Sequence, residues 1–236
     1  MARPRTVGDN RGRLEKQEMS QALKKKKLMT VEEYLRFEER SKYKHEYMDG
    51  EVFRLHDNNN TPQLAGNRVS HVFIVSNISF YLRLALREKK KNCQVGTTEM
   101  RVLLRENHYA YPDVFAVCGD VSLVPDIFDT LENPAVIFEV LSKSTEARDR
   151  GDKALDYRKL ETLADYVLVS QDKMRIEQQT RQADGTWKIL VFENAKDKIY
   201  FASLDCEIMV RDIYENINFP PKPNLKLVSS NKKNGK

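Results

Sequence analysis

The stretch that decides the fold reads Ala135-Val136-Ile137-Phe138-Glu139-Val140-Leu141, an apolar run interrupted by a single acid. A second apolar run, over residues 113–118, opens on Asp113. Short apolar runs without polar alternation are typical of strands that are covered on both faces of a sheet. A carboxylate in such a strand costs free energy unless it is paired, hydrogen-bonded or bound to a cation. If the two strands are neighbours, Asp113 and Glu139 converge at one end of the sheet.

Each acid also has an ordinary explanation when it is taken alone. Asp113 follows Pro112 and could be a turn residue, and Glu139 could pair with an arginine or a lysine. Taken together, the two acids favour an oxygen-rich site for Mg²⁺ or Mn²⁺, in which waters and a substrate phosphate fill the remaining positions. The pair therefore predicts a metal site, with both ordinary explanations left open.

The elements around this stretch predict an α/β fold. We expect residues 145–162 to form a helix, capped by Ser144 or Thr145, that leads to a strand over 166–170. Such a strand, helix, strand unit makes a right-handed parallel crossover. Upstream, apolar residues spaced by three and four predict a long amphipathic helix from 67 to about 89, followed by a strand over 99–104. The expected order is helix, three strands, helix, strand, in a mixed central sheet flanked by helices.

Both ends of this core carry expected additions. Thr30 and Glu33 have the spacing of a capping box that starts a short helix. Asp49-Gly50 predicts a hairpin, and Asp184-Gly185 predicts a second one that joins strands over 175–181 and 187–192. The core therefore has an N-terminal helix and hairpin and a C-terminal β extension.

Length and composition indicate one catalytic domain. The chain has 236 residues, of which 40% are hydrophobic and 32% charged, and we find no apolar stretch of the ~20 residues that a membrane helix needs. We expect a flexible basic extension over 1–28, a folded unit over 29–219 and a flexible basic tail over 220–236. No secretory signal is recognisable, so we expect a soluble, cytoplasmic protein with no membrane partner.

The patterns of cysteine, histidine and lysine indicate which kinds of site the protein has. Three widely spaced cysteines predict reduced, buried thiols, and the four histidines lack zinc-ligand spacing. The net charge is +5, and lysines cluster at 24–27, at 89–91 and in the tail at 231–236. Such clusters suit nucleic-acid phosphates, although solvated lysine runs are an equally good explanation.

Several motifs taken together resemble the Uma2 family, whose members are regarded as endonucleases of the PD-(D/E)xK superfamily. The resemblance runs from about 29 to about 219 and includes His71. It is carried by these segments and residues: Glu46-x-x-Asp49-Gly50-Glu51, Tyr111-Pro112-Asp113-Val114, Phe138 through Thr145, Asp149, Lys153, Tyr157 and Ala164-Asp165-Tyr166. Each fragment is weak by itself, but the combination is specific.

The resemblance implies a restriction-endonuclease-like core in which Asp113 and Glu139 hold the metal. It also suggests that Glu46 completes the metal shell, although a surface acid in a hairpin is nearly as good an explanation. Glu51 and His71 have weaker claims to the site. The roles of Glu46, Glu51 and His71 are implied by the family resemblance alone.

This sequence departs from the superfamily pattern at the lysine. That lysine would fall at Leu141, which carries no charge, and the Uma2 family commonly lacks it as well. Lys153 lies on the helix after Glu139, four residues from Asp149, and is our candidate for a migrated catalytic lysine. An exposed Asp149–Lys153 helix pair is the alternative, and Lys143 is the next candidate. Lys143 and Ser170 also replace a typical proline and a typical acid of the family.

The activity implied is Mg²⁺- or Mn²⁺-dependent hydrolysis of phosphodiester bonds in DNA. The rival interpretation is a catalytically inactive DNA-binding or protein-interaction module that kept the fold, because a fold alone does not establish activity. RNA or branched DNA is a further alternative substrate, since no base-reading motif is recognisable. The oligomeric state is left open between a monomer and a homodimer.

Overall fold

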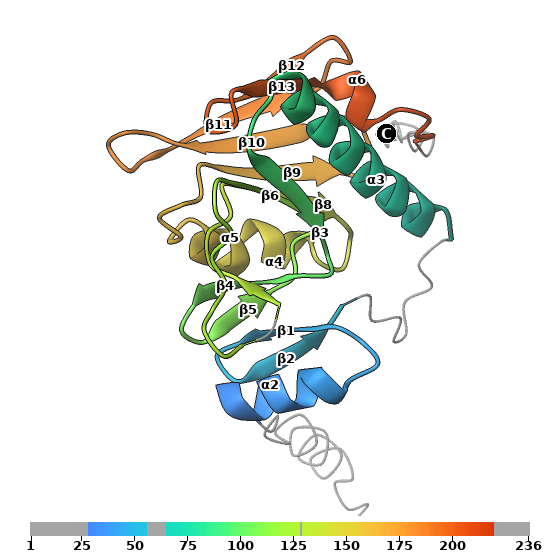
Figure 1. Cartoon of the computed structure of the whole chain (residues 1–236). Helices are drawn as coiled ribbons and strands as arrows, with labels where there is room; N and C mark the ends of the chain where they lie inside the picture. The colour runs from blue at the N-terminus through green and yellow to red at the C-terminus, as the bar shows by residue number, and fades with distance from the viewer. Residues whose placement is uncertain (1–27, 56–64, 128, 220–236) are drawn as a thin grey trace, which may run out of the picture. The chain divides into compact units, whose positions relative to one another are not determined.

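The computed structural model describes residues 28–55, 65–127 and 129–219 (Figure 1). Two compact units meet in sequence between Leu55 and His56. The extensions expected over 1–28 and 220–236 lie almost wholly outside the described residues, so their flexibility and the domain boundaries stay predictions.

The N-terminal unit consists of helix α2 and a hairpin. Thr30 Oγ1 accepts a hydrogen bond from the Glu33 amide, and the Glu33 side chain accepts one from the Thr30 amide, which confirms the predicted capping box. The hairpin turns at Asp49 and Gly50, whose φ angles are 48° and 91°. Positive φ at both positions is the conformation that an Asp-Gly turn favours. The elements are α2 (Val31–Arg40), β1 (His45–Met48) and β2 (Glu51–Arg54).

The C-terminal unit is built on a six-stranded mixed sheet with the order β11-β10-β9-β8-β6-β3. Only β8 and β9 pair in parallel in this sheet, and the helices between them make the predicted crossover. The fold class is therefore confirmed as mixed α/β. The strands are β3 (Cys93–Thr97), β6 (Val114–Cys118), β8 (Val136–Leu141), β9 (Asp165–Ser170), β10 (Ile176–Arg181) and β11 (Trp187–Phe192).

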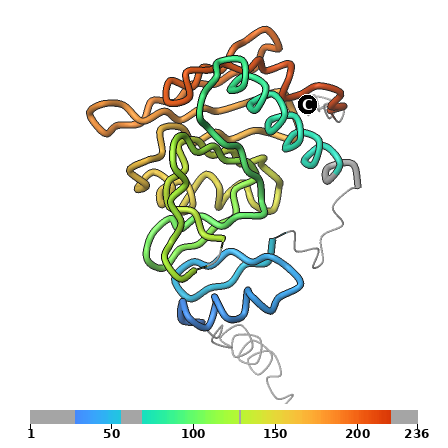
Figure 2. Tube along the Cα trace, in the orientation of Figure 1, coloured from blue at the N-terminus to red at the C-terminus, as the bar shows by residue number. Residues whose placement is uncertain are grey.

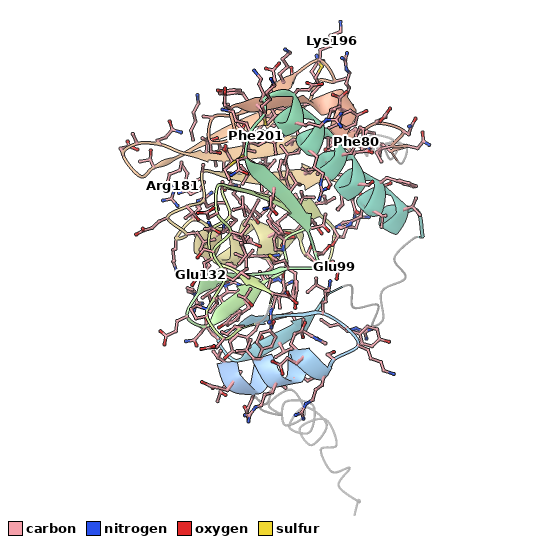
Figure 3. The ribbon with its side chains drawn as sticks, in the orientation of Figure 1. Phe80, Glu99, Glu132, Arg181, Lys196 and Phe201 are labelled. Carbon is pink, nitrogen blue, oxygen red and sulfur yellow. A yellow bond between two sulfur atoms is a disulfide. The ribbon has the colours of Figure 1, made fainter. Side chains whose placement is uncertain are left out.

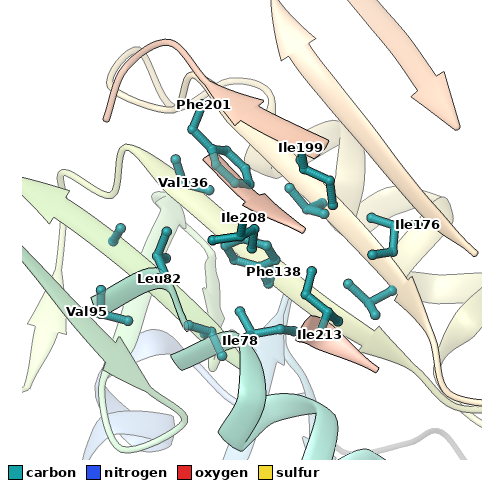
Figure 4. Packing of buried hydrophobic residues seen from close by; sticks show 14 of the residues in the cluster. Ile78, Leu82, Val95, Val136, Phe138, Ile176, Ile199, Phe201, Ile208 and Ile213 are labelled. Atoms are coloured by element: carbon teal, nitrogen blue, oxygen red, sulfur yellow. The ribbon is translucent and has the colours of Figure 1, made fainter. Parts of the chain in front are cut away.

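One face of the sheet packs against helix α3 (Ala65–Glu88) and a C-terminal group of elements (Figures 1 and 2). Alternate residues of a strand point to opposite faces, and the even-numbered residues of β8 point here. Figure 4 shows Phe138 among side chains from α3 and the C-terminal elements. These elements are β12 (Lys198–Phe201), β13 (Cys206–Met209) and α6 (Val210–Ile213).

Tyr214, directly after α6, ties this C-terminal group to the turn between β9 and β10. Its side chain is buried, and its hydroxyl lies 3.0 Å from the carbonyl oxygen of Ser170 and 2.8 Å from that of Arg175. The same hydroxyl accepts a hydrogen bond from the Arg175 amide at 3.1 Å. One side chain therefore holds both sides of the turn.

The opposite face of the sheet is covered by two short helices and three short strands. Odd-numbered β8 residues Ile137 and Leu141 pack here, in a cluster with Ala154 and Tyr157. The covering elements are α4 (Glu146–Arg150), α5 (Asp152–Tyr157), β4 (Arg101–Arg105), β5 (His108–Ala110) and β7 (Thr130–Leu131). Glu139, between Ile137 and Leu141, therefore faces α4 and α5.

Two element predictions need correction. The single helix expected over 145–162 is broken at Gly151, whose φ and ψ of −97° and −118° are not helical. The first core strand is β3 and not the segment expected over 99–104, because β4 pairs with β5 and β7 outside the six-stranded sheet. The order of helix, three strands, helix pair and strand is kept by β3, β6 and β8.

The cysteine prediction is wrong for two of the three residues. Cys93 and Cys118 lie opposite each other on β3 and β6 and form a disulfide. They are 25 residues apart in sequence, and only strand pairing brings them together. Cys206 is a free, buried thiol as predicted, and burial raises its pKa to about 11. The cytoplasmic location stays a prediction.

Helix α3 also corrects an expectation about membrane-like segments. Residues Val69–Glu88 are long and apolar enough, by composition alone, to cross a membrane. However, α3 buries Ile74, Ile78, Leu82 and Leu86 in the core against the sheet. One such helix is weak evidence of a membrane span, because core helices of other proteins pass the same test, and 22% of this segment is buried.

Candidate active site

Asp113 and Glu139 occupy facing positions on neighbouring strands. Asp113 directly precedes β6, and Glu139 lies within β8. The antiparallel register pairs Val114 with Phe138, so one further step places Asp113 opposite Glu139. The Val140 amide donates a 2.7 Å hydrogen bond to Asp113 Oδ2. Both acids are buried, with 7% and 4% of their surface exposed.

Lys153 of α5 reaches Glu139 from the helix pair that covers this face. Its Nζ lies 2.9 Å from Glu139 Oε1 and 3.5 Å from Asp149 Oδ1, and the lysine is 3% exposed. An ammonium group is rarely buried without paired acids. The alternative of an exposed Asp149–Lys153 pair is therefore wrong, whereas the expectation that Glu139 pairs with a lysine is met by this same contact.

Two tyrosine hydroxyls donate hydrogen bonds to residues of this cluster. The Tyr157 hydroxyl donates a 3.0 Å hydrogen bond to Glu139 Oε1, and the Tyr166 hydroxyl donates a 2.8 Å bond to the Asp149 carbonyl oxygen. The two rings contact each other, with centroids 5.1 Å apart. Burial, followed by the charges of Glu139 and Asp149, raises the pKa of Tyr166 well above its usual range. Tyr166 therefore remains a neutral donor.

His71 of α3 contacts the other strand acid, Asp113. Its Nε2 lies 3.3 Å from Asp113 Oδ2. Burial lowers the pKa of His71, but the nearby charge and hydrogen bond of Asp113 outweigh it, so the pKa is raised. Burial likewise opposes ionisation of Asp113, but His71, the Val140 amide and Lys153 hold its pKa below the usual value. Both shifts favour the charged forms, which are a carboxylate beside an imidazolium.

The donor set suits a hard divalent cation of the kind that uses few protein ligands. The cluster brings together three carboxylates, those of Asp113, Glu139 and Asp149, with one lysine and one histidine. Within the described residues, no three acidic, histidine or cysteine side chains form a ready-made metal cage. Mg²⁺, however, typically takes only one or two carboxylates and fills its shell with waters and substrate phosphate. Asp113 and Glu139 are the residues that could hold it.

The remaining predicted residues are Glu46, Glu51, Leu141 and Lys143. Glu46 is buried in β1 and Glu51 half-buried in β2, both in the N-terminal unit, so their membership of the cluster stays a prediction. Leu141, where the superfamily lysine would fall, is buried among apolar side chains. Lys143 is exposed in the turn after β8. The contact of His71 with Asp113 is the feature that sequence reasoning undervalued, and its only signal was the family motif.

Two proteins of Synechocystis are similar to this chain over most of its length. The uncharacterized protein slr1290 of Synechocystis sp. is 30% identical over 192 residues, which cover 81% of this chain and 94% of the relative. A second uncharacterized Synechocystis protein, sll1609, is 28% identical over 181 residues, covering 75% of this chain and 96% of that protein.

A solved structure from Anabaena variabilis, described as a "putative nuclease", has the same fold. It superposes with a TM-score of 0.56 at 15% identity and covers 79% of this chain and 97% of its own. The sequence profile of the Uma2 family, described as "putative restriction endonuclease", matches residues 31–204. That match spans the helix pair, the paired strands and every residue of the cluster, and the chain belongs to the Uma2 family.

Proposed function

We propose that this protein is a Mg²⁺-dependent endonuclease that hydrolyses phosphodiester bonds in DNA. The observation that carries the proposal is the buried cluster at the end of two paired strands, in which Glu139 and Asp149 both contact Lys153 and Asp113 contacts His71. Burying several acids together is unfavourable unless a cation is shared among them. Membership of a family described as "putative restriction endonuclease" supports this interpretation of the cluster.

The chain's own residues would prepare the reaction in three ways. Asp113 and Glu139 would hold Mg²⁺, which when bound makes water a stronger nucleophile and offsets charge on the phosphoryl oxygens. Lys153 would donate from Nζ to the attacking water or to a phosphoryl oxygen in the transition state. Tyr157 would keep the Glu139 carboxylate oriented through its hydroxyl. His71 would hold the Asp113 carboxylate in its ionised form.

The test is incubation of the purified chain with plasmid, linear duplex and single-stranded DNA. Each substrate is combined with Mg²⁺, with Mn²⁺ or with EDTA, and the products are resolved on gels. We expect cleavage that needs the metal and stops with EDTA. Cleavage of RNA in preference to every DNA form would correct the substrate. Absence of metal-dependent cleavage of any nucleic acid would contradict the proposal.

A second candidate is an inactive module that binds DNA or another protein. The observation in its favour is that Leu141 replaces the superfamily lysine and is packed in the apolar core. Lys153 is then only the counter-ion of Glu139 and Asp149. DNA binding without metal-dependent cleavage would favour this candidate.

A further inference from the structure

A cavity at the C-terminal end of α3 carries a concentration of positive charge. Its volume is about 370 Å³, and it is lined by Arg83, Leu86 and Arg87 of α3, Lys91 of the following loop, and Cys93, Gln94 and Val95 of β3. Leu86 and Val95 are buried and form an apolar floor, whereas the three cationic side chains are exposed around it. The cavity lies wholly within the C-terminal unit.

The cationic groups are arranged to receive an anion. One nitrogen of the Arg83 guanidinium donates a 2.6 Å hydrogen bond to the Val95 carbonyl oxygen, which positions the group and leaves its other donors available. Neither Arg83 nor Arg87 forms an ion pair with any residue that the structure describes. Lys91 pairs with Asp205 at 3.0 Å, but both side chains are exposed, so this pair is weak and screened by salt. Guanidinium groups bind phosphate oxygens with particularly favourable geometry.

Helix α3 links this cavity to the candidate active site. His71, near one end of α3, contacts Asp113, and Arg87 lies sixteen residues further along the same helix. At 1.5 Å per residue the two positions are about 24 Å apart, which corresponds to roughly seven base pairs of duplex at 3.4 Å each. A nucleic-acid backbone that passes the active site can therefore reach the cavity within one helical turn of duplex.

From this arrangement we infer that the cavity is a second contact for the phosphodiester backbone, at which Arg83, Arg87 and Lys91 bind a phosphate about seven base pairs from the scissile bond. The choice of ligand rests on the proposed function, whereas the cavity and its charge do not. The site would add affinity and would not take part in bond cleavage, because it lies far from Glu139 and Lys153.

The test compares duplexes of two lengths. In fluorescence anisotropy, a duplex of 20 base pairs can span the active site and the cavity, whereas one of 6 base pairs cannot. For the variant R87Q/K91Q we expect roughly tenfold weaker binding of the long duplex and a log-log salt slope that is smaller by about 1.8, since each phosphate contact contributes about 0.9. Binding of the short duplex should be unchanged.

A matched control tests whether losing any two lysines weakens binding, and a second variant tests the effect of reversing the charge. K188Q/K196Q removes two exposed lysines elsewhere in the C-terminal unit (Lys196 is labelled in Figure 3) and should bind both duplexes like the wild type. R87E reverses the charge of a side chain that forms no ion pair within residues 28–55, 65–127 and 129–219, so it should fold normally and weaken long-duplex binding further. Melting curves check the fold of each variant.

Four outcomes decide the inference. Equal weakening with both duplexes, or no weakening with R87Q/K91Q and R87E, would overturn it. Inorganic phosphate could also compete with the long duplex for the cavity. If it does so at concentrations that leave the salt slope of the wild type unchanged, the cavity is a site for free phosphate and the inference is overturned. If the wild type cuts no nucleic acid but the length-dependent difference persists, the inference stands and the nuclease proposal fails.

Discussion

Two charge clusters in the C-terminal unit are centred on buried acids and include a residue of helix α5, and they are built in opposite ways. Around Asp156, one carboxylate meets Arg105 at 2.7 Å, Lys159 at 2.6 Å and His108 at 2.6 Å. In the Glu139 cluster, Glu139 and Asp149 contact Lys153, and Asp113 contacts His71. The first cluster has more basic groups than acids, and the second has more acids than basic groups.

This difference separates a structural ion network from a site that could accept a cation. Although burial opposes ionisation of Asp156, hydrogen bonds from Lys159, His108 and Arg105 lower its pKa to about 2. The negative charge of Asp156 is thus balanced by basic side chains of the protein itself. The Glu139 cluster retains an excess of negative charge, which a bound metal and a substrate phosphate could share. Four predictions test this contrast.

The largest effect should follow the loss of a carboxylate in the Glu139 cluster. Glu139→Gln and Asp113→Asn keep the side-chain shape but remove a ligand charge, so we expect Mn²⁺ binding in calorimetry to be lost and cleavage to fall by at least ~10³-fold. Glu132→Gln changes a half-buried acid outside the cluster and should behave like the wild type. Normal Mn²⁺ binding by both cluster variants would show that the metal site is misassigned.

Replacing the lysine should affect the rate more than the metal. Lys153→Met should lower the single-turnover cleavage rate by about 10²- to 10³-fold, as for other lost transition-state contacts. Metal affinity should not fall, because Nζ no longer competes for Glu139 Oε1. Lys159→Met removes a lysine from the Asp156 cluster and should leave the rate unchanged. If Lys153→Met cuts at the wild-type rate, Lys143 becomes the next candidate.

The hydrogen bond from Tyr157 should have a smaller effect on the same cluster. Tyr157→Phe removes only the hydroxyl that donates to Glu139, and bonds of this kind to charged groups contribute about 1.5–3 kcal/mol. We expect Mn²⁺ affinity and cleavage to fall about tenfold, with the fold retained because the ring is kept. Tyr34→Phe, a hydroxyl deletion in the N-terminal unit, is the matched control. Equal metal affinity in Tyr157→Phe and wild type would refute the positioning role.

The Asp156 cluster should influence stability and leave catalysis intact. Its folded pKa of about 2 lies below the ordinary value, so its contribution is present above about pH 4 and is lost as the pH falls through about 2. After allowance for solvent screening, we expect Asp156→Asn to cost about 1–2 kcal/mol at pH 7. Urea unfolding at pH 7 and at pH 2.5 measures this, and the variant's deficit should shrink at the lower pH. A deficit independent of pH would contradict the assignment.

Sequence reasoning anticipated the elements whose signals are local. The apolar spacing of α3, the capping box at Thr30 and the turn at Asp49-Gly50 depend on neighbouring residues only. Strand β3 could not be anticipated in this way, because its residues include few apolar side chains. Its place depends on β6, where the Phe115 ring fills the space that a Cβ on Gly96 would occupy, 2.2 Å from the nearest ring atom.

Part of the candidate site could be predicted from the sequence, because two of its acids also have local signals. Asp113 and Glu139 stand out because each interrupts or opens an apolar strand, which is visible in sequence. The approach of Lys153 to Glu139 followed only from family resemblance, since the helix that carries it is broken at Gly151. The contacts of His71 and Asp156 join residues more than 40 positions apart, and no local pattern predicts such pairs.

The anchoring of Tyr214 sets a limit on how far the chain can be shortened. The family profile ends at residue 204, but Ile208, Val210, Ile213 and Tyr214 lie in the main core beyond that point. A chain cut after 204 would uncover the face of the sheet that packs against α3 and would lose the clamp on the turn at Ser170 and Arg175. Domain swaps and truncations of this protein should therefore keep residues through 219, even though the profile of its relatives stops earlier.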